Sequence, residues 1–329
     1  AAAEGPTEWD AWGSGEDQAI LSDYREAVVE YAKLLGEPLD GLDIVVDCGN
    51  GMASTTTPAV LRELGAHVVT LNGNVDGHFP GRESKPTAET LGDCMAFLED
   101  GDADFGIAHD GDADRIVVLD GEGDVVHEDT VLAMLAEEYT RESDADDPVV
   151  VTTPNASARI DERVREAGGR VERVALGYLH DGIADARAGG GDVVFAAEPW
   201  KHVHTQFGGW IDGVCSAAVL SRLFAERGLA ERREPISERP YRKVSVPCPD
   251  ERKAPAMAQL AESLPAAFPD ASVDDEYGVR LELPDASWVL VRPSGTEPYL
   301  RIYAESETVE ELVAAARDVV ETAIEHRTG

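Results

Sequence analysis

The sequence Phe105-Gly106-Ile107-Ala108-His109-Asp110-Gly111-Asp112-Ala113-Asp114-Arg115-Ile116-Val117-Val118-Leu119 organises the chain around it. Apolar, β-branched runs flank the acidic segment, and such runs are typical of buried strands. We therefore predict one strand that ends before Asp110 and another that begins after Arg115. The acidic segment is then the loop that joins the two strands.

This loop has the donor types of a divalent-cation site. Asp110, Asp112 and Asp114 stand at alternate positions, so their carboxylates repel one another unless a cation lies among them. Compact sets of carboxylate oxygens suit Mg²⁺. A calcium loop of the EF-hand type is excluded, because its sixth position would be Arg115 instead of Gly and its twelfth Gly121 instead of Glu. A plain acidic surface turn remains the alternative.

Arg115 favours a phosphate-handling site over such a turn. It follows the acidic triplet directly. A guanidinium presents paired donors that match the oxygens of a phosphate. We therefore predict that Arg115 contacts a phosphate group beside the cation.

The composition excludes several classes of protein. The chain has 329 residues, with 65 acidic against 28 basic side chains and a net charge of −37. Such a field opposes nucleic acid and anionic membranes as partners, whereas a hydrophobic content of 43% opposes disorder. The acidic, Lys-poor surface is typical of adaptation to high salt.

The sequence also indicates a compartment. No apolar run is long enough to span a bilayer, and the first residues lack the pattern of a signal peptide. The cysteines are far apart without C-x-x-C spacing, so we predict buried free thiols instead of disulfides or a zinc site. We expect a cytoplasmic protein.

Alternating strand and helix patterns predict the fold class. They indicate two tandem α/β domains with mostly parallel sheets, followed by a C-terminal α+β domain. The second α/β domain repeats the plan of the first, with a strand, an Asn-containing turn, a helix, a Gly and a second strand. Ligands of such sheets bind beyond the carboxyl ends of the strands, where the acidic loop is predicted.

A second reactive segment is Ala197-Glu198-Pro199-Trp200-Lys201-His202-Val203-His204, which follows a predicted strand over 192–196. A strand that runs into Glu, Lys, His and Trp is typical of a binding site. His202 and His204 have the spacing of metal ligands. A His pair without a third ligand is more often polar lining, and both interpretations stay open.

A third segment predicts an anion-binding turn. Arg292-Pro293-Ser294-Gly295-Thr296-Glu297-Pro298, with Arg301 on the following strand, combines hydroxyls, backbone N–H groups around a Gly and two guanidiniums. In so acidic a chain, paired arginines around such a turn favour phosphate binding. An ordinary hairpin turn with surface arginines is the alternative.

Together these segments resemble the α-D-phosphohexomutases, the family of phosphoglucomutase, phosphomannomutase and phosphoglucosamine mutase. The resemblance implies interconversion of hexose 1-phosphate and hexose 6-phosphate through a bisphosphorylated intermediate. It implies that Asp110, Asp112 and Asp114 hold Mg²⁺ and that Arg115 supports the transferring phosphate. It assigns the substrate's other phosphate to Arg292, Ser294, Gly295, Thr296 and Arg301.

The sugar loop of that family usually reads Gly-Glu-x-Ser-Gly-His, against Ala197-Glu198-Pro199-Trp200-Lys201-His202 here. By the resemblance, Glu198 is a sugar-hydroxyl ligand and His202 falls in register. Lys201 is a candidate for the sugar site by proximity. The Ser and the Gly do not match, so the preferred hexose stays open.

The family also carries its phosphoryl group on a serine in a Thr-x-Ser-His-Asn-Pro loop of an N-terminal domain, and this chain has no Ser-His pair. The resemblance therefore predicts a fragment or a split protein that cannot turn over alone, with the N-terminal domain as a partner in trans. The predicted divisions are 1–40, a tail and helix left from that domain; 41–141, metal-binding; 142–236, sugar-binding; and 237–329, phosphate-binding.

Two other functions fit the same residues. A metal-dependent sugar phosphatase would also use an aspartate cluster and a phosphate turn, and product analysis separates it from a mutase. A non-catalytic sugar-phosphate-binding subunit would need no serine domain of its own. We further expect the domain with Arg292 to act as a mobile lid that hinges near 234–240.

Overall fold

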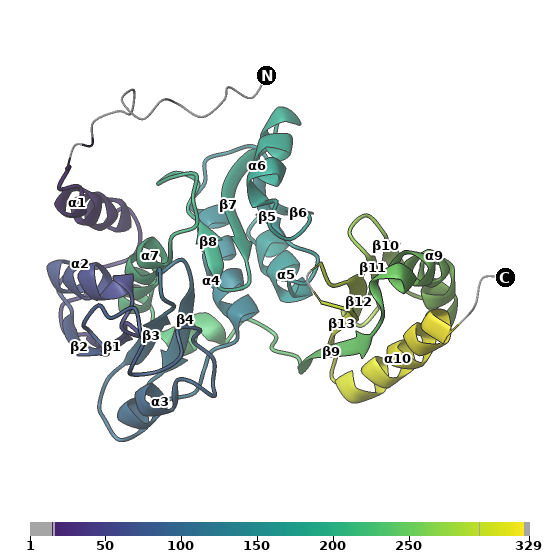
Figure 1. The fold of residues 1–329 in the computed structure, drawn as a ribbon. Coiled ribbons are helices and arrows are strands. Elements are labelled where there is room, and N and C mark those ends of the chain that lie inside the picture. Colours follow the sequence, from purple (N-terminus) through teal and green to yellow (C-terminus); the bar gives the residue numbers. More distant parts are fainter. Residues whose placement is uncertain (1–14, 16, 296, 326–329) are drawn as a thin grey trace, which may run out of the picture.

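The computed structural model describes residues 15, 17–295 and 297–325. Almost all of the predicted N-terminal tail lies outside these residues, as does Thr296 of the predicted phosphate turn. Three β-sheets form the framework, and the third belongs to a C-terminal lobe that stands apart from the other two (Figure 1). The predicted fold class, two α/β units and a C-terminal α+β unit, is confirmed.

The first sheet has the strand order β2-β1-β3-β4. β1 is parallel to β2 and β3, whereas β4 returns antiparallel to β3 and places Ile116 opposite His109. Residues 110–115 therefore form a hairpin loop at the carboxyl end of β3. The strands are β1 (Asp43–Asp47), β2 (His67–Leu71), β3 (Phe105–His109) and β4 (Ile116–Asp120).

The second sheet has the same plan, with the order β6-β5-β7-β8. Again the central strand pairs in parallel with two neighbours, and the last strand returns antiparallel. The predicted repeat is therefore confirmed, and the hairpin at 199–200 takes the place that the acidic loop has in the first sheet. The strands are β5 (Pro148–Thr152), β6 (Arg170–Arg173), β7 (Asp192–Glu198) and β8 (Lys201–Val203).

Two helices pack on the other α/β unit from the one to which the predicted domain boundaries assign them. α4 (Glu128–Arg141) packs on the second sheet with α5 (Ala158–Glu166), although it precedes residue 142. α7 (Gly213–Glu226) packs on the first sheet's strand β4 and on α1 (Leu21–Ala32) and α2 (Thr57–Glu63). One hydrophobic core therefore runs through both α/β units and includes α1, which the sequence assigned to the remnant of another domain.

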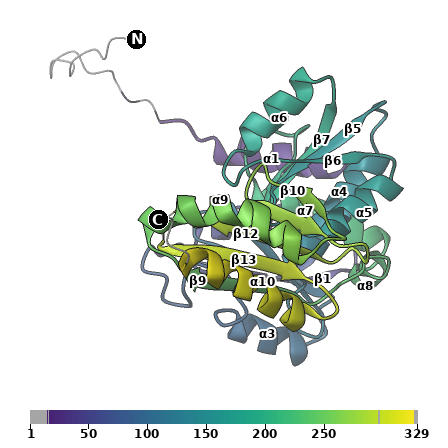
Figure 2. The same cartoon turned by 90° about the vertical axis from the view of Figure 1, so that its right-hand side faces the viewer.

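The third sheet is antiparallel, in the order β10-β11-β12-β13-β9. Helices α9 and α10 lie side by side on one of its faces (Figure 2). The opposite face packs Trp288, Leu290 and Tyr303 against Ala158 at the start of α5. The elements are β9 (Tyr241–Pro247), α9 (Asp250–Ala267), β10 (Ser272–Asp274), β11 (Val279–Glu282), β12 (Trp288–Pro293), β13 (Tyr299–Glu305) and α10 (Val309–Glu325).

The remaining elements complete the two α/β units. α3 packs on the first sheet, and α6 packs on the second. All four cysteines are buried free thiols, as predicted. None of the helices in the described ranges has both the length and the apolar character that crossing a bilayer requires. These elements are η1 (Met52–Thr55), α3 (Gly92–Glu99), α6 (Leu179–Ala188) and α8 (Leu229–Arg233).

Candidate active site

The acidic loop is closed by bonds to its own backbone. Arg115 N donates to Asp110 Oδ1 at 3.1 Å, and Ala113 N donates to the Asp110 carbonyl at 3.3 Å. His109 Nδ1 lies 2.8 Å from the Arg115 carbonyl and therefore donates to it. Ala113 takes a φ of 62°, the left-handed conformation of a tight turn. The loop curls so that the alternate side chains meet.

The three aspartates form a set of ligands that fits Mg²⁺. Asp110, Asp112 and Asp114 each offer a carboxylate oxygen, and these oxygens lie within 4.8 Å of one another. Burial, together with repulsion from Asp114 and Asp112, raises the pKa of Asp110 to about 6. Asp114 Oδ1 is buried and has no hydrogen-bond partner among the described residues. A cation would satisfy this oxygen and relieve the repulsion.

A buried ion pair supports the base of the loop, and the sequence analysis missed it. Arg82 Nε donates to Asp47 Oδ2 at 2.8 Å, and the two side chains are 5% and 2% exposed. Arg82 also donates to the His109 carbonyl at 2.6 Å. His109 Nε2 lies 3.1 Å from the Thr57 hydroxyl, and burial lowers the pKa of His109 to about 4. The neutral ring thus fixes the strand end from which the aspartates project.

Gly51 allows a second segment to approach the loop. Met52 N donates to the Gly111 carbonyl at 2.9 Å. A Cβ at Gly51 would lie 2.6 Å from that carbonyl oxygen and 2.9 Å from the Asp110 carbonyl oxygen. The glycine is therefore needed for close packing against the acidic loop.

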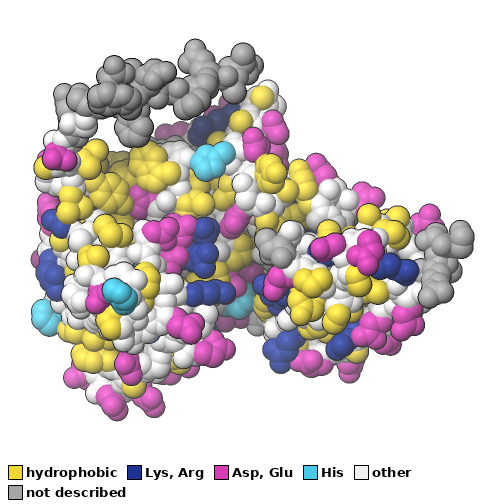
Figure 3. All heavy atoms as spheres, in the orientation of Figure 1, with side chains coloured by type: hydrophobic (Ala, Val, Ile, Leu, Met, Phe, Trp, Pro, Cys, Tyr) yellow, Lys and Arg dark blue, Asp and Glu magenta, His cyan; other side chains and the backbone are white. Residues whose placement is uncertain are grey.

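The predicted sugar loop, residues 197–204, lies directly against the acidic loop, residues 110–115, which is called the metal loop below. Arg115 and Lys201 form an isolated antiparallel bridge, and Ile116 N donates to the Trp200 carbonyl at 3.1 Å. Lys201 Nζ donates to Asp114 Oδ2 at 2.5 Å. Acidic and basic side chains are gathered at the centre of the larger lobe (Figure 3). The structure thus brings together two segments that are more than eighty residues apart in the chain.

Glu198 lies at the end of β7 and contacts a loop that the sequence analysis did not identify. Gly177 N donates to Glu198 Oε1 at 2.5 Å. Tyr178, the next residue, is 58% exposed. No sequence pattern around Gly177 indicated this contact.

His202 lies below the sugar loop and not on its surface. Its ring is 1% exposed, and Nδ1 donates to Ser216 Oγ at 3.0 Å. Ser216 Oγ also accepts from His204 Nε2 at 2.8 Å and donates to the Asp212 carbonyl at 2.8 Å. Burial lowers the pKa of His202 to about 3 and the pKa of His204 well below its usual value. Both rings are neutral polar lining in this arrangement, which argues against direct sugar contact by His202.

The described residues offer the His pair no third ligand. Across the described part of the chain, the group of three or more His, Cys, Asp or Glu side chains positioned for a metal is the aspartate trio. The open alternative of a metal at His202 and His204 is therefore not supported by the geometry.

The predicted phosphate turn joins β12 to β13. Arg292 and Arg301 are register partners on these strands. Arg292 donates to the Tyr303 hydroxyl at 2.9 Å, and Arg301 contacts Glu297 and Ser245. Both guanidiniums lie on the face of the sheet that is turned toward the α/β units, because Trp288 and Leu290 of that face pack on α5.

Backbone contacts hold the turn itself. Ser294 N donates to the Tyr299 carbonyl at 3.0 Å. Lys253 Nζ donates to the carbonyls of Ser294 and Glu297, each at 2.7 Å. A Cβ added at Gly295 would meet no described atom within 4 Å, its two chain neighbours aside. Thr296, the remaining predicted ligand, lies outside the described residues.

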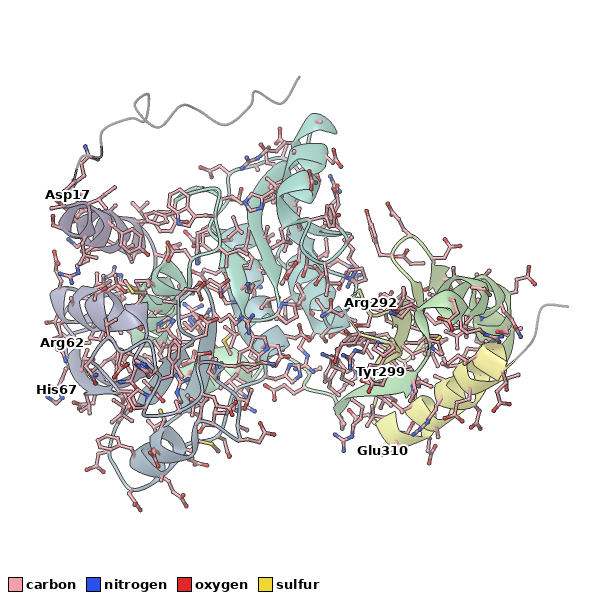
Figure 4. The ribbon with its side chains drawn as sticks, viewed as in Figure 1. Asp17, Arg62, His67, Arg292, Tyr299 and Glu310 are labelled. Atoms are coloured by element: carbon pink, nitrogen blue, oxygen red, sulfur yellow. The ribbon has the colours of Figure 1, made fainter. Side chains whose placement is uncertain are left out.

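The predicted phosphate turn borders a depression that it shares with the second α/β unit. A depression of about 480 Å³ is bounded by Arg292 and Gly295 on one side and by Ala175 and Leu176 on the other. Leu176 precedes Gly177, the residue bonded to Glu198. Arg292 and Tyr299 lie at the edge of the C-terminal lobe that faces the rest of the molecule (Figure 4).

Family comparisons match both ends of this arrangement. Residues 22–123 match the phosphoglucomutase/phosphomannomutase alpha/beta/alpha domain II, and residues 244–322 match the C-terminal domain of the same family. The chain belongs to the phosphoglucomutase/phosphomannomutase family. The first match begins within α1 and so includes that helix with the metal-loop unit.

Individual phosphohexomutases and their relatives agree with this assignment. The chain is 40% identical to a phosphopentomutase of Thermococcus kodakarensis over 91% of its own length, and 41% identical to a probable phosphoglucosamine mutase of Methanopyrus kandleri over 92%. A phosphoglucomutase/phosphomannomutase family protein of Burkholderia thailandensis superposes with a TM-score of 0.78 at 25% identity, covering 94% of this chain and 65% of that one. The chain spans 65% of the length of either curated relative.

The C-terminal sheet adds a cation that the sequence analysis missed. Lys243 is the register partner of Tyr303 on β9, and its Nζ lies 5.6 Å from the centre of the Tyr303 ring. Desolvation and the nearby charges of Arg301 and Arg292 lower the pKa of Lys243. Lys243 lies four residues before the strand end at Pro247, far from the turn motif in sequence, so only strand pairing could reveal it.

Proposed function

We propose that this chain supplies the Mg²⁺ site and the substrate-phosphate site of a phosphohexomutase that interconverts hexose 1-phosphate and hexose 6-phosphate through a bisphosphorylated intermediate. The proposal is supported by two clusters of charged side chains in one chain, the first of which contacts the predicted sugar loop. Asp110, Asp112 and Asp114 form one site, and Arg292 with Arg301 forms the other. A mutase needs both, since it uses both ends of one sugar.

In this proposal, Asp110, Asp112 and Asp114 hold Mg²⁺, which would neutralise charge on the transferring phosphoryl oxygens. Arg115 adds a second positive group on the same side. Its Nε lies 3.4 Å from Asp110 Oδ2 and 3.7 Å from Asp114 Oδ1, so it is already aligned along the trio. Phosphoryl transfer depends mainly on such positioning and charge stabilisation.

Arg292, Ser294, Gly295 and Arg301 would hold the phosphate that is not being transferred, with Thr296 as a further ligand. Two guanidiniums that are register neighbours repel each other, and a dianion between them removes that repulsion. Because the C-terminal lobe carries these groups, its movement about 234–240 would adjust the distance between the two phosphate sites.

For the sugar itself, Glu198 is the proposed hydroxyl ligand, and Lys201 lies at the boundary with the metal loop. The relative from Thermococcus kodakarensis is named a phosphopentomutase, so a pentose phosphate is the competing substrate. Titration of the chain with glucose 6-phosphate and with ribose 5-phosphate, under one set of conditions, decides between the two classes.

A second candidate role, as a subunit that works with a separate serine-bearing domain, is supported by the surface beside the metal loop. Leu21, Met52 and Trp210 are 40%, 50% and 51% exposed. They border a depression of about 270 Å³ that also includes Asp112 and Asp114. We propose that the phosphoryl-bearing partner approaches the metal loop from this side. Mutase activity that arises when the serine domain of a relative is added in trans would support this role.

The main experiment measures sugar-phosphate affinity after substitution of the phosphate turn. Arg292→Ala and Arg301→Ala should each weaken binding of glucose 6-phosphate by at least tenfold, the size of a lost charge-assisted hydrogen bond to phosphate. Arg242→Ala is the matched control, because Arg242 is an exposed arginine of the same sheet that pairs with Glu310. Unchanged affinity in both turn variants would contradict the assignment, and release of inorganic phosphate would indicate a phosphatase.

A further inference from the structure

We propose that Lys201 is a tethered counter-ion of the metal loop, which exchanges partners when a divalent cation binds. Its ammonium neutralises Asp114 in the cation-free loop. It leaves that carboxylate when the cation arrives and then contacts an oxygen of the phosphate beside the cation. This inference rests on the proposed function, because it assumes that the aspartate trio binds a divalent cation.

The contact between the two side chains carries the first part of the argument. Lys201 Nζ lies 2.5 Å from Asp114 Oδ2, and the side chains are 24% and 28% exposed. The same carboxylate is one of the three that converge within 4.8 Å. The ammonium therefore holds the carboxylate whose other oxygen, Oδ1, is free for a cation. A cation on the same carboxylate would lie close to the ammonium and repel it.

The backbone keeps Lys201 in place when its side chain leaves. Lys201 forms an antiparallel bridge with Arg115, and Ile116 N donates to the Trp200 carbonyl at 3.1 Å. Trp200 takes a φ of 74°. Its side chain packs against an apolar cluster of the first sheet that includes Val117. The hairpin tip is thus fixed from both sides, and only the four-carbon stem of Lys201 can swing.

The surroundings of Lys201 identify its second partner as a phosphate. Arg115 is the β-bridge partner of Lys201, and its guanidinium lies close to the carboxylates of Asp110 and Asp114. An ammonium displaced from Asp114 therefore stays beside a guanidinium, and two adjacent cations are stabilised by an anion between them. Glu198 shares the hairpin, but its Oε1 already accepts from Gly177 N at 2.5 Å. The anion that the proposed reaction brings to this place is the transferring phosphate.

The exchange makes two opposite predictions for one substitution. Without the competing ammonium, Lys201→Met should bind Mn²⁺ about three- to tenfold more tightly than the unmodified chain, as expected for a partly exposed ion pair. With saturating Mg²⁺, the same variant should bind inorganic phosphate about three- to tenfold more weakly. A merely structural role of Lys201 would weaken both.

The test uses the whole chain, with Mn²⁺ affinity measured by calorimetry and by the electron paramagnetic resonance signal of free Mn²⁺. Lys33→Met removes a lysine from an exposed ion pair with Glu30 and should leave both affinities unchanged. Lys201→Arg keeps the charge and should resemble the unmodified chain. Lys201→Gln replaces Lys201→Met if circular dichroism shows that the latter misfolds.

The outcomes separate this inference from the proposed function. If the unmodified chain binds no Mn²⁺, the proposed metal site fails. If it binds Mn²⁺ and the neutral variants bind it equally well or more weakly, the exchange is overturned while the metal site stands. Unchanged phosphate affinity in the neutral variants also overturns the exchange.

Discussion

Arg292 on β12 and Arg301 on β13 are direct cross-strand partners. Like charges in such positions destabilise a sheet. Arg292 Nε is buried and lacks a hydrogen-bond partner within the described ranges. The repulsion between the two guanidiniums therefore destabilises the sheet, and an anion bound between them would remove this repulsion.

This relationship predicts a stability effect that depends on phosphate. Arg292→Met should change the free energy of unfolding by less than about 1 kcal/mol in phosphate-free buffer, because repulsion and bonds are lost together. Phosphate at about 10 mM should raise the melting temperature of the unmodified chain and leave that of the variant unchanged. Arg242→Met, on the opposite face, should keep the phosphate effect. An equal shift in all three proteins would show that phosphate acts elsewhere.

The aspartate trio predicts stabilisation by Mg²⁺. A cation at a hundred times its dissociation constant adds about 2.7 kcal/mol to the free energy of unfolding. Asp114→Asn should abolish this gain, since it removes one of three converging carboxylates. Asp124→Asn removes the same charge from the exposed turn after β4 and should preserve the gain. Urea unfolding with Mg²⁺ and with EDTA measures the difference, and an Mg²⁺ effect that survives in Asp114→Asn would rule out the site.

Gly51 predicts that a single methyl group disturbs the metal loop. Its Cβ would lie 2.6 Å from the Gly111 carbonyl oxygen, so Gly51→Ala should displace the loop and cost about 1–3 kcal/mol of stability. Mn²⁺ affinity should fall with it. Gly77→Ala has open space at the same atom and is the control. Calorimetry that finds normal Mn²⁺ affinity in Gly51→Ala would contradict this account of the glycine.

The buried histidines predict loss of stability in acid. Burial lowers the pKa of His202 to about 3, whereas the unfolded chain protonates this residue near its usual pKa of about 6.5. The free energy of unfolding is therefore highest above about pH 6.5, where both states hold the ring neutral. It declines as the pH falls toward the folded pKa, by up to about 1.4 kcal/mol per pH unit for each histidine. His204, whose pKa is also lowered, adds a second such term.

Urea unfolding at pH 7 and pH 5 tests this prediction. His202→Gln should show a smaller loss between the two pH values than the unmodified chain, which isolates the histidine from the carboxylates that titrate in the same range. His78→Gln is the control, because the His78 side chain is 96% exposed. Equal losses in all three proteins would contradict the prediction.

The charge balance predicts dependence on salt. With 65 acidic and 28 basic side chains, the folded chain repels itself at low ionic strength. The Debye length falls from about 10 Å at 0.1 M to about 3 Å at 1 M salt, so molar KCl should raise the free energy of unfolding. Sucrose at the same osmolality provides a comparison that does not screen charge. A melting temperature that responds equally to KCl and sucrose would exclude screening as the cause.

The sequence by itself determined the local features of this protein. Apolar runs and alternation gave the strand that ends at His109, the acidic loop and the turn after Arg292, because these depend on neighbours in the chain. Short or weakly patterned elements such as α6 (Leu179–Ala188) and β10 (Ser272–Asp274) were missed, since tertiary packing stabilises them more than their own pattern does.

Only the tertiary structure decided which groups share a site. Strand pairing places Lys243 near Arg301, and the repeated hairpins bring Lys201 to Asp114. The tertiary structure also buries His202, for which the sequence predicted a place in the sugar site. Its side chain points into the core and contacts Ser216. Sequence motifs fix the chemistry of a side chain, whereas sheet order and strand register fix what that side chain can reach.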